Sequence, residues 1–222
     1  ARSRSSPRTA QQVAARGVQR AGPARIETRG GMANVAEIKA QIPLPETADE
    51  LCAVAQDLKA DTGRDILLGA KATEREVKRL SAVGELAKYR LVHFATHGLL
   101  AGDLKGTSEP GLILTPPSTA SEEDDGYLSA SEITALKLDA DWVILSACNT
   151  AAGTATNAEA LSGLARAFIY AQARALLVSH WEVYSDATVK LITGVVREID
   201  RDPRVGRAEA LRRSLLALID TG

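Results

Sequence analysis

A short apolar run that ends in a cysteine constrains this chain most. Residues 141–147 read Asp-Trp-Val-Ile-Leu-Ser-Ala, and Cys148 follows directly. The run is too short for a lone helix, and its Val, Ile and Leu residues are typical of a parallel strand covered on both faces. Reactive groups in open parallel sheets gather at the carboxyl ends of the strands, so Cys148 is a candidate nucleophile.

Two further strand-like runs end in polar residues. Residues 89–95 lead into Thr96-His97-Gly98, and residues 175–179 lead into His180 and Trp181. His97 and Cys148 are 51 residues apart, which is enough chain for a crossover that brings two parallel strand ends together. A crossover of this kind is right-handed. We therefore expect His97, Cys148 and His180 at one edge of a sheet.

Helical patterns alternate with the strands, which predicts an α/β fold. The first helix, 46–59, places Ala48, Leu51, Cys52, Ala55 and Leu58 on one apolar stripe, so Cys52 is expected in the core. Thr73 and Ser129 each begin a capping-box pattern at the start of a helix. Short strands are predicted at 65–68 and 111–115, and further helices at 73–86, 130–136, 159–173, 185–199 and 207–219.

Composition suits one globular α/β domain. The 222 residues are 45% hydrophobic and 25% charged, which allows a sizeable core. We expect no membrane span, because no apolar run is long enough, and no secretory signal, because the arginine-rich beginning lacks an apolar segment. Two cysteines, Cys52 and Cys148, require no disulfide, and a free thiol nucleophile favours the reducing cytoplasm.

Charge divides the chain unevenly. Residues 1–34 carry seven arginines and one glutamate, whereas the rest carries 20 basic and 27 acidic residues. This basic stretch lacks interleaved aromatic residues, so we expect a solvated arm rather than a nucleic-acid-binding segment. We interpret residues 1–42 as a low-complexity arm or the remnant of an upstream module, and residues 43–222 as the folded domain.

Four motifs in order carry a family resemblance. They are Ala95-Thr96-His97-Gly98, residues 145–150 with Cys148, residues 163–168, and Ser179-His180-Trp181. From about Leu44 to Leu218 the chain resembles CHAT domains, which belong with the caspase and separase cysteine peptidases. The resemblance implies a caspase-like three-layer sandwich, with a mostly parallel central sheet and helices on both faces. It also implies that a helical repeat module precedes the domain in the intact protein.

The resemblance assigns catalytic roles to Cys148 and His97. A thiolate at Cys148 would attack a peptide carbonyl, while His97 takes the thiol proton and returns it to the leaving amine. Gly98 follows the histidine without a side chain, so its N–H and that of Cys148 can form an oxyanion hole. This chemistry needs neither a metal nor a cofactor. His93 lies about 13 Å from His97 along a strand at ~3.3 Å per residue, so we expect it to pack in the sheet.

Substrate contacts are expected after the third strand. His180 is a rival base, but it lacks a following glycine, and we favour His180 and Trp181 as a wall of the substrate cleft. Glu182 and Asp186 could receive a basic side chain of a protein substrate, although Asp186 could instead cap the next helix. Many family members have Pro and Asp where this chain has Glu182 and Tyr184.

Two other functions stay open at this point. One is a catalytically silent interaction module with a caspase-like fold, and the other is a thiol acyl transferase or amidase that uses the same dyad. CHAT-like domains usually close with one more strand after the final helix, and the sequence ends at Gly222 without one. An open sheet edge of that kind predicts marginal stability or self-association.

Overall fold

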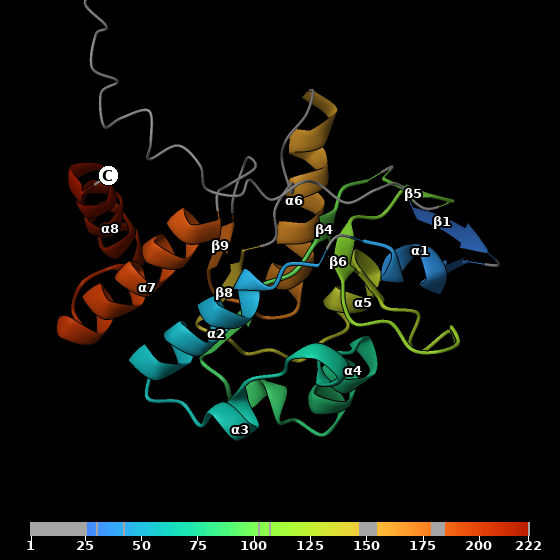
Figure 1. Cartoon of the computed structure of the whole chain (residues 1–222), viewed down its shortest axis with the longest axis horizontal. Helices are drawn as coiled ribbons and strands as arrows, with labels where there is room; N and C mark the ends of the chain where they lie inside the picture. Colours follow the sequence, from blue (N-terminus) through green and yellow to red (C-terminus); the bar gives the residue numbers. More distant parts are fainter. Residues whose placement is uncertain are drawn as a thin grey trace, which may run out of the picture.

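The computed structural model describes residues 26–29, 31–41, 43–101, 103–106, 108–146, 155–178 and 185–221. In these ranges the chain has a mixed α/β fold with three small sheets. Figure 1 shows the elements in chain order from blue to red. No helix of the described residues has the length and apolar character needed to cross a bilayer.

The helices and strands have the following bounds, where η marks a 3-10 helix. The first half holds β1 (Ile26–Arg29), β2 (Met32–Ala33), α1 (Val35–Lys39), α2 (Glu46–Asp57), α3 (Thr62–Asp65), η2 (Gly69–Lys71), α4 (Glu74–Ala82), η3 (Leu86–Lys88), β3 (Leu91–Phe94) and β4 (Gly98–Leu99). The second half holds β5 (Leu104–Lys105), β6 (Gly111–Ile113), β7 (Tyr127–Ser129), α5 (Ala130–Thr134), β8 (Trp142–Leu145), α6 (Ala155–Tyr170), β9 (Leu176–Val178), α7 (Ser185–Arg201) and α8 (Arg207–Thr221).

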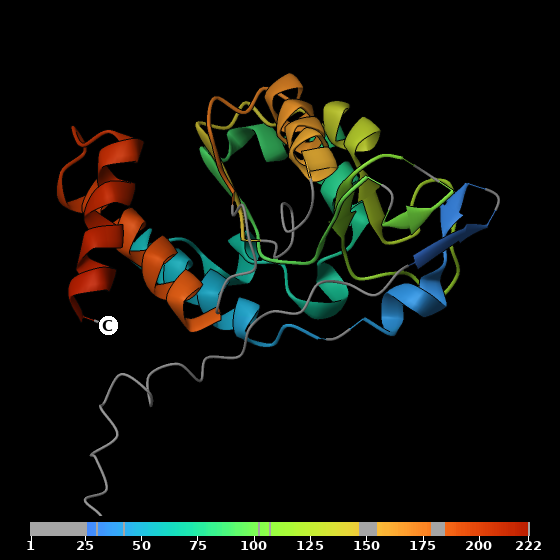
Figure 2. The ribbon, with the colours of Figure 1, turned by 90° about the horizontal axis from the view of Figure 1, so that it is seen from above.

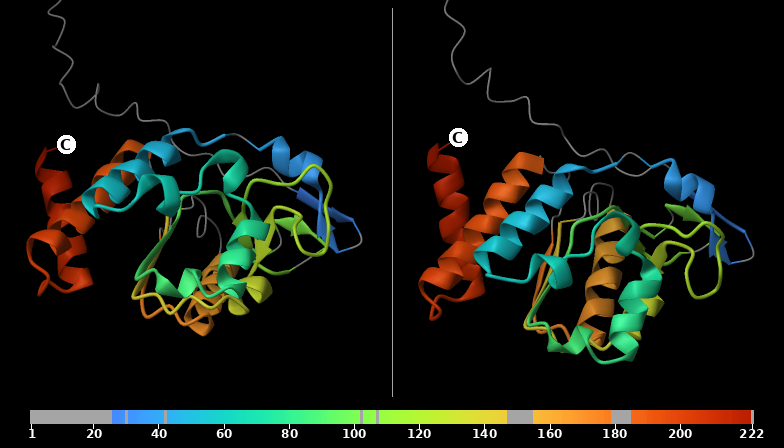
Figure 3. Two further views of the ribbon diagram at one scale, coloured as in Figure 1. Left: turned by 90° about the horizontal axis from the view of Figure 1, so that it is seen from below. Right: turned by 60° about the horizontal axis from the view of Figure 1, so that its bottom comes forward.

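The sheet that contains β8 is parallel throughout. Its order is β3-β8-β9, and Leu91 pairs with Trp142 while Phe94 pairs with Leu145. All four side chains of β8 are buried, as the continuous apolar run predicts for a strand covered on both faces. Figure 3 shows α2, α7 and α8 on one side of these strands and α4 and α6 on the other.

Alternate residues of β8 face different cores. Trp142 and Ile144 pack with Val54 of α2 and with residues of α7, whereas Val143 and Leu145 pack with residues of α4 and α6. This division follows from the two-residue period of a strand, which turns successive side chains to opposite faces. Figure 2 shows α7 and α6 on opposite sides of the strands from a second direction.

The remaining strands do not extend this parallel sheet. Strands β4, β6 and β7 form an antiparallel sheet, and β1 lies between antiparallel β2 and parallel β5. The described strands thus form three separate small sheets, and the three-layer sandwich with a mostly parallel central sheet that the family resemblance implies is not confirmed. A third core joins these two small sheets, with Ile26, Leu99 and Tyr127 among its buried residues.

The predicted N-cap residues of two helices are confirmed, and one of the two forms the complete capping box. Ser129 and Glu132 form a complete capping box at the start of α5, and the Thr73 side chain accepts a hydrogen bond from the Glu76 N–H at the start of α4. Such caps satisfy amide groups that have no partner within the helix. The Glu76 carboxylate pairs with Arg79 instead of closing the predicted second box.

Other local predictions are wrong. Residues 66–68 form no strand, Asp65 ends α3 instead, and none of the described strands pairs with this segment. Helix α2 forms as predicted, but Glu50, Val54 and Ala55 are its buried residues. Cys52 is only half-buried and Leu58 is 44% exposed. The sequence patterns also did not predict β1, β2 and α1, which lie within the segment interpreted as a basic arm.

The packing of α6 on the sheet gives a first prediction. Phe168 is fully buried and its ring lies 5.7 Å from that of Phe94, whereas the next residue, Ile169, is 51% exposed. Phe168→Ala should lower the free energy of unfolding by about 3–5 kcal/mol, because it leaves a cavity. Ile169→Ala should cost much less. Urea unfolding measures both, and equal losses would contradict this packing.

Candidate active site

His97 lies between the end of β3 and the start of β4, and its backbone is held by β6. The Ile113 N–H donates to the His97 carbonyl at 2.9 Å, and the Thr96 hydroxyl donates to the Ile113 carbonyl. His97 is buried, with 6% of its surface exposed. The turn from a parallel sheet into an antiparallel one therefore fixes the backbone of His97 three residues after the end of β3.

Gly98 presents its backbone amide away from β6. Gly98 pairs with Leu112, and the neighbouring hydrogen bond joins Ile113 N–H to the His97 carbonyl. In an antiparallel ladder this arrangement makes Gly98 and Leu112 a non-hydrogen-bonded pair, whose amides point outward. Because β4 is an edge strand among the described strands, the Gly98 N–H faces out of the sheet.

Close packing within this sheet requires glycine at another position. A Cβ atom on Gly111 would lie 2.6 Å from the Leu128 carbonyl oxygen and 2.6 Å from the Tyr127 ring. Real Cβ atoms do not approach so closely, so a side chain here would push β6 away from β7. Since β6 also holds the backbone of His97, Gly111 contributes indirectly to the position of the imidazole.

Strand β8 ends at Leu145, three residues before the predicted nucleophile. The Ser146 N–H donates to the Phe94 carbonyl at 3.0 Å and so continues the pairing of β8 with β3. Cys148 itself, and the predicted substrate residues His180, Trp181 and Glu182, lie outside the described residues. Asp186 lies in the first turn of α7, which begins at Ser185, and only its backbone is described.

His93 packs in the sheet, as its place in a strand predicts. Its side chain is 4% exposed, and its Nε2 atom forms a 2.8 Å hydrogen bond with the Ser146 hydroxyl. The same Nε2 atom lies 2.9 Å from Oε1 of Glu50, which is fully buried on α2. Sequence patterns did not point to Glu50, because a single glutamate on an amphipathic helix gives no sign that it faces inward.

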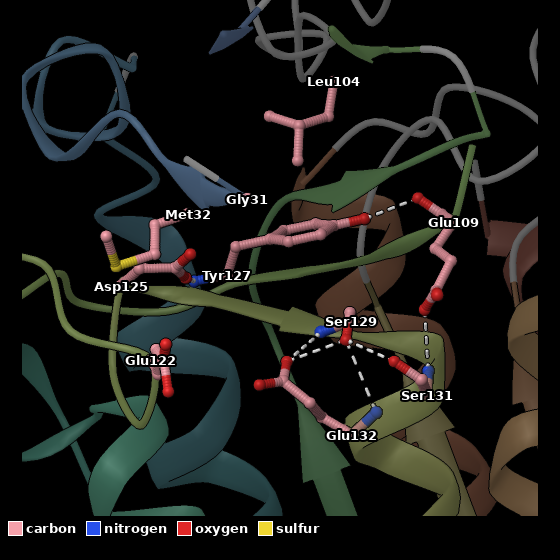
Figure 4. A pocket seen from close by; sticks show the side chains of 10 residues that line it. All are labelled: Gly31, Met32, Leu104, Glu109, Glu122, Asp125, Tyr127, Ser129, Ser131 and Glu132. Atoms are coloured by element: carbon pink, nitrogen blue, oxygen red, sulfur yellow. Dashed lines mark hydrogen bonds between the residues drawn. The ribbon is translucent and has the colours of Figure 1, made fainter. Parts of the chain in front are cut away.

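A pocket of about 360 Å³ lies beside β7, which contributes Tyr127 and Ser129 to its lining. Figure 4 shows the Tyr127 ring crossing it, with the Tyr127 hydroxyl donating to the Glu109 carbonyl at 2.7 Å. Four acidic residues line it, namely Glu109, Glu122, Asp125 and Glu132. Neither His97 nor Gly98 lines this pocket. The carboxylates of Glu109, Asp125 and Glu132 each accept a hydrogen bond from a backbone amide of the protein itself.

A lysine beside this pocket neutralises two carboxylates. The Lys78 ammonium lies 2.5 Å from Glu74 and 2.7 Å from Glu132. Burial raises the pKa of Glu74 to about 7. Burial acts the same way on Glu132, but hydrogen bonds from Lys78 and Ser129 outweigh it and lower the pKa of that carboxyl. Although burial opposes it, the two carboxylates raise the pKa of Lys78.

This cluster predicts a pH-dependent loss of stability. Lys78→Met should lower the free energy of unfolding by about 3 kcal/mol at pH 8, because it leaves buried charge without a partner. The loss should shrink as the pH falls to 4. Glu74 takes up a proton below about pH 7 and then no longer needs the ammonium, whereas the lowered pKa of Glu132 keeps that carboxyl ionised further into the acid range, so part of the loss remains at pH 4. Denaturant unfolding at both pH values measures this.

The matched control is Arg79→Met. Arg79 lies one residue further along α4 and pairs with Glu76 on the surface, where its side chain is 54% exposed. Water screens such a pair, so its loss should be much smaller and should vary little with pH. A Lys78→Met deficit that is as large at pH 4 as at pH 8 would exclude the Glu74 carboxylate as a cause.

Comparison with known protein families identifies the chain. The family model of the CHAT domain matches residues 1–222, so the chain belongs to the CHAT domain family. This family is related to the caspase-like cysteine peptidases. No curated protein matches the sequence.

Proposed function

We propose that this protein is a cysteine endopeptidase that acts through Cys148 and His97. The observation that supports the proposal is the register of β3 and β8. Phe94 pairs with Leu145, and three residues after each of them come His97 and Cys148. Neighbouring strands lie about 4.8 Å apart. Because His97 and Cys148 each follow a paired residue by three positions, their side chains are expected to lie close enough for a proton transfer.

The proposed reaction has two steps. His97 accepts the thiol proton of Cys148, and the thiolate attacks the peptide carbonyl to form a tetrahedral intermediate. The C–N bond then breaks, the imidazolium gives its proton to the leaving amine, and a thioester acyl-enzyme remains. In the second step His97 takes a proton from water, whose oxygen attacks the thioester, and the thiol regains a proton as the acid leaves.

We assign the oxyanion hole to the amides of Gly98 and Cys148. The outward direction of the Gly98 N–H supports this, because the amide does not donate a hydrogen bond to β6. Two preorganised amides directed at the carbonyl oxygen would stabilise the charge that develops there, and a single donor of this kind typically contributes 10²–10³-fold in rate.

The proposal includes the wider setting that the family resemblance implies. Parallel pairing in β3-β8-β9 and the helices on both of its faces support a caspase-like three-layer arrangement. The substrate would be a protein or peptide, and the place of action the cytoplasm, where a thiol stays reduced. A helical repeat module upstream in the intact protein would present the substrate.

Mutation of the proposed nucleophile tests this function. Cys148→Ala should abolish peptide cleavage and leave the free energy of unfolding within about 1 kcal/mol of the wild type, since it removes one sulfur atom. His97→Ala should also abolish cleavage and should prevent an electrophilic peptide probe from labelling Cys148. Mass spectrometry of the labelled protein measures this.

Cys52→Ala is the matched control. Cys52 is the other thiol of the chain and lies half-buried on α2, so its replacement should leave turnover and labelling nearly intact. If the wild type and Cys148→Ala cleave equally or not at all, the protein is not a Cys148 peptidase, and an interaction module would explain the fold better.

We further propose a preference for Arg or Lys before the cut bond. Glu182 and Asp186 follow the β9 strand in sequence and could supply negative charge in a desolvated site. A peptide-library profile should show enrichment of basic residues that weakens in Asp186→Ala. Enrichment of Asp or of apolar residues, unchanged by that substitution, would show that Glu182 and Asp186 do not determine the specificity.

A further inference from the structure

A buried polar cluster joins three elements beside the proposed site. It consists of Glu50 on α2, His93 on β3 and Ser146 at the end of β8. His93 Nε2 lies 2.8 Å from the Ser146 hydroxyl and 2.9 Å from the Glu50 carboxylate. Glu50 is fully buried, the His93 side chain is 4% exposed, and Ser146 is 3% exposed.

The surroundings of this cluster are apolar. The same face of the sheet carries Trp142 and Ile144, which pack against Val54 of α2 and Val195 of α7. Burying a carboxylate costs several kcal/mol even when it has a partner, and apolar residues of similar size often stabilise a core equally well. The cluster therefore needs a reason other than stability, and buried titratable groups of this kind gather at functional sites.

The geometry excludes an independent serine triad. In a triad the acid binds one imidazole nitrogen and the serine binds the other. Here Glu50 and Ser146 approach the same atom, Nε2, and His93 Nδ1 is buried with no hydrogen-bond partner among the described residues. The Ser146 hydroxyl is also covered, so no substrate reaches it. His93 consequently holds Ser146 and does not activate it.

The cluster acts on the last described residue before the proposed nucleophile. The Ser146 backbone is bound to Phe94 of β3, and its side chain is bound to His93 of the same strand. Cys148 comes two residues later in the sequence. We propose that Glu50 and His93 are positioning residues for the Cys148 thiol, and this rests on the peptidase function proposed above. His93 binds the Ser146 side chain while Phe94 binds its backbone, so the residue from which the chain continues to Cys148 is held at two points.

Activity of the whole protein gives the first test. Ser146→Ala and Glu50→Gln should each lower kcat about tenfold with KM within twofold of the wild type, because the substrate still binds while the thiol is misplaced. Ser146→Thr, which keeps the hydroxyl, should restore most of the rate. The double variant Glu50→Gln/Ser146→Ala should be no slower than the slower single variant, because both substitutions act through contacts with the same residue, His93.

A second measurement separates this inference from the peptidase proposal. In a Cys52→Ala background only Cys148 reacts with iodoacetamide, so the alkylation rate reports on its thiol without any peptide. Ser146→Ala should change that rate at least threefold and Ser146→Thr should return it towards the wild-type value. If no peptide is cleaved by the wild type but this pattern holds, the peptidase proposal fails and the positioning role stands.

Glu74→Gln is the matched control. Glu74 is also a buried glutamate on a helix, but its partners are Lys78 and the amides of Asp125 and Gly126. This variant should lower the melting temperature without changing the alkylation rate or kcat. If Ser146→Ala and Glu50→Gln also lower only the melting temperature, the cluster is structural and the inference is wrong. Ser146→Ala removes only one oxygen atom, so it distinguishes a positioning role from a structural one even if Glu50→Gln does not fold.

Discussion

The in-register parallel pairing of β3 with β8 is the interaction on which the rest of this structure depends. It aligns Leu91 with Trp142 and Phe94 with Leu145, and so decides which side chains enter which core. A slip of one residue would turn every side chain of a strand to the opposite face. It would also separate His93 from Ser146. His97 and Cys148 would then no longer follow a pair of aligned residues by the same number of positions, which is the basis of the proposed dyad.

Two kinds of contact then attach the surrounding elements to this pair of strands. Apolar packing supplies most of the stabilisation, through α6 on one face and α7 on the other. Buried polar clusters add contacts between particular elements, Glu50 with His93 on one side and Glu74 with Lys78 and Glu132 on the other. Such contacts are costly when broken, because the remaining partner keeps a buried charge.

The antiparallel sheet explains how His97 is presented. The chain leaves β3, and within three residues it enters β4, whose pairing with β6 fixes the His97 carbonyl and directs the Gly98 amide outward. A loop alone would leave an imidazole free to sample several positions. Here β4 begins directly after His97 and β6 binds the His97 carbonyl, which preorganises the backbone of the residue before any substrate binds.

The sequence by itself determined the elements with strong local signals. The unbroken apolar run predicted β8, and Ser129 with Glu132 predicted the start of α5. Both signals depend only on residues that are close together in the sequence. It also placed His97 directly after a strand. Only the tertiary structure decided that residues 66–68 stay out of the sheet, that β1 pairs with β5, and that α2 buries Glu50 instead of Leu58. Each of these depends on a partner distant in the chain, and local periodicity carries no information about such a partner.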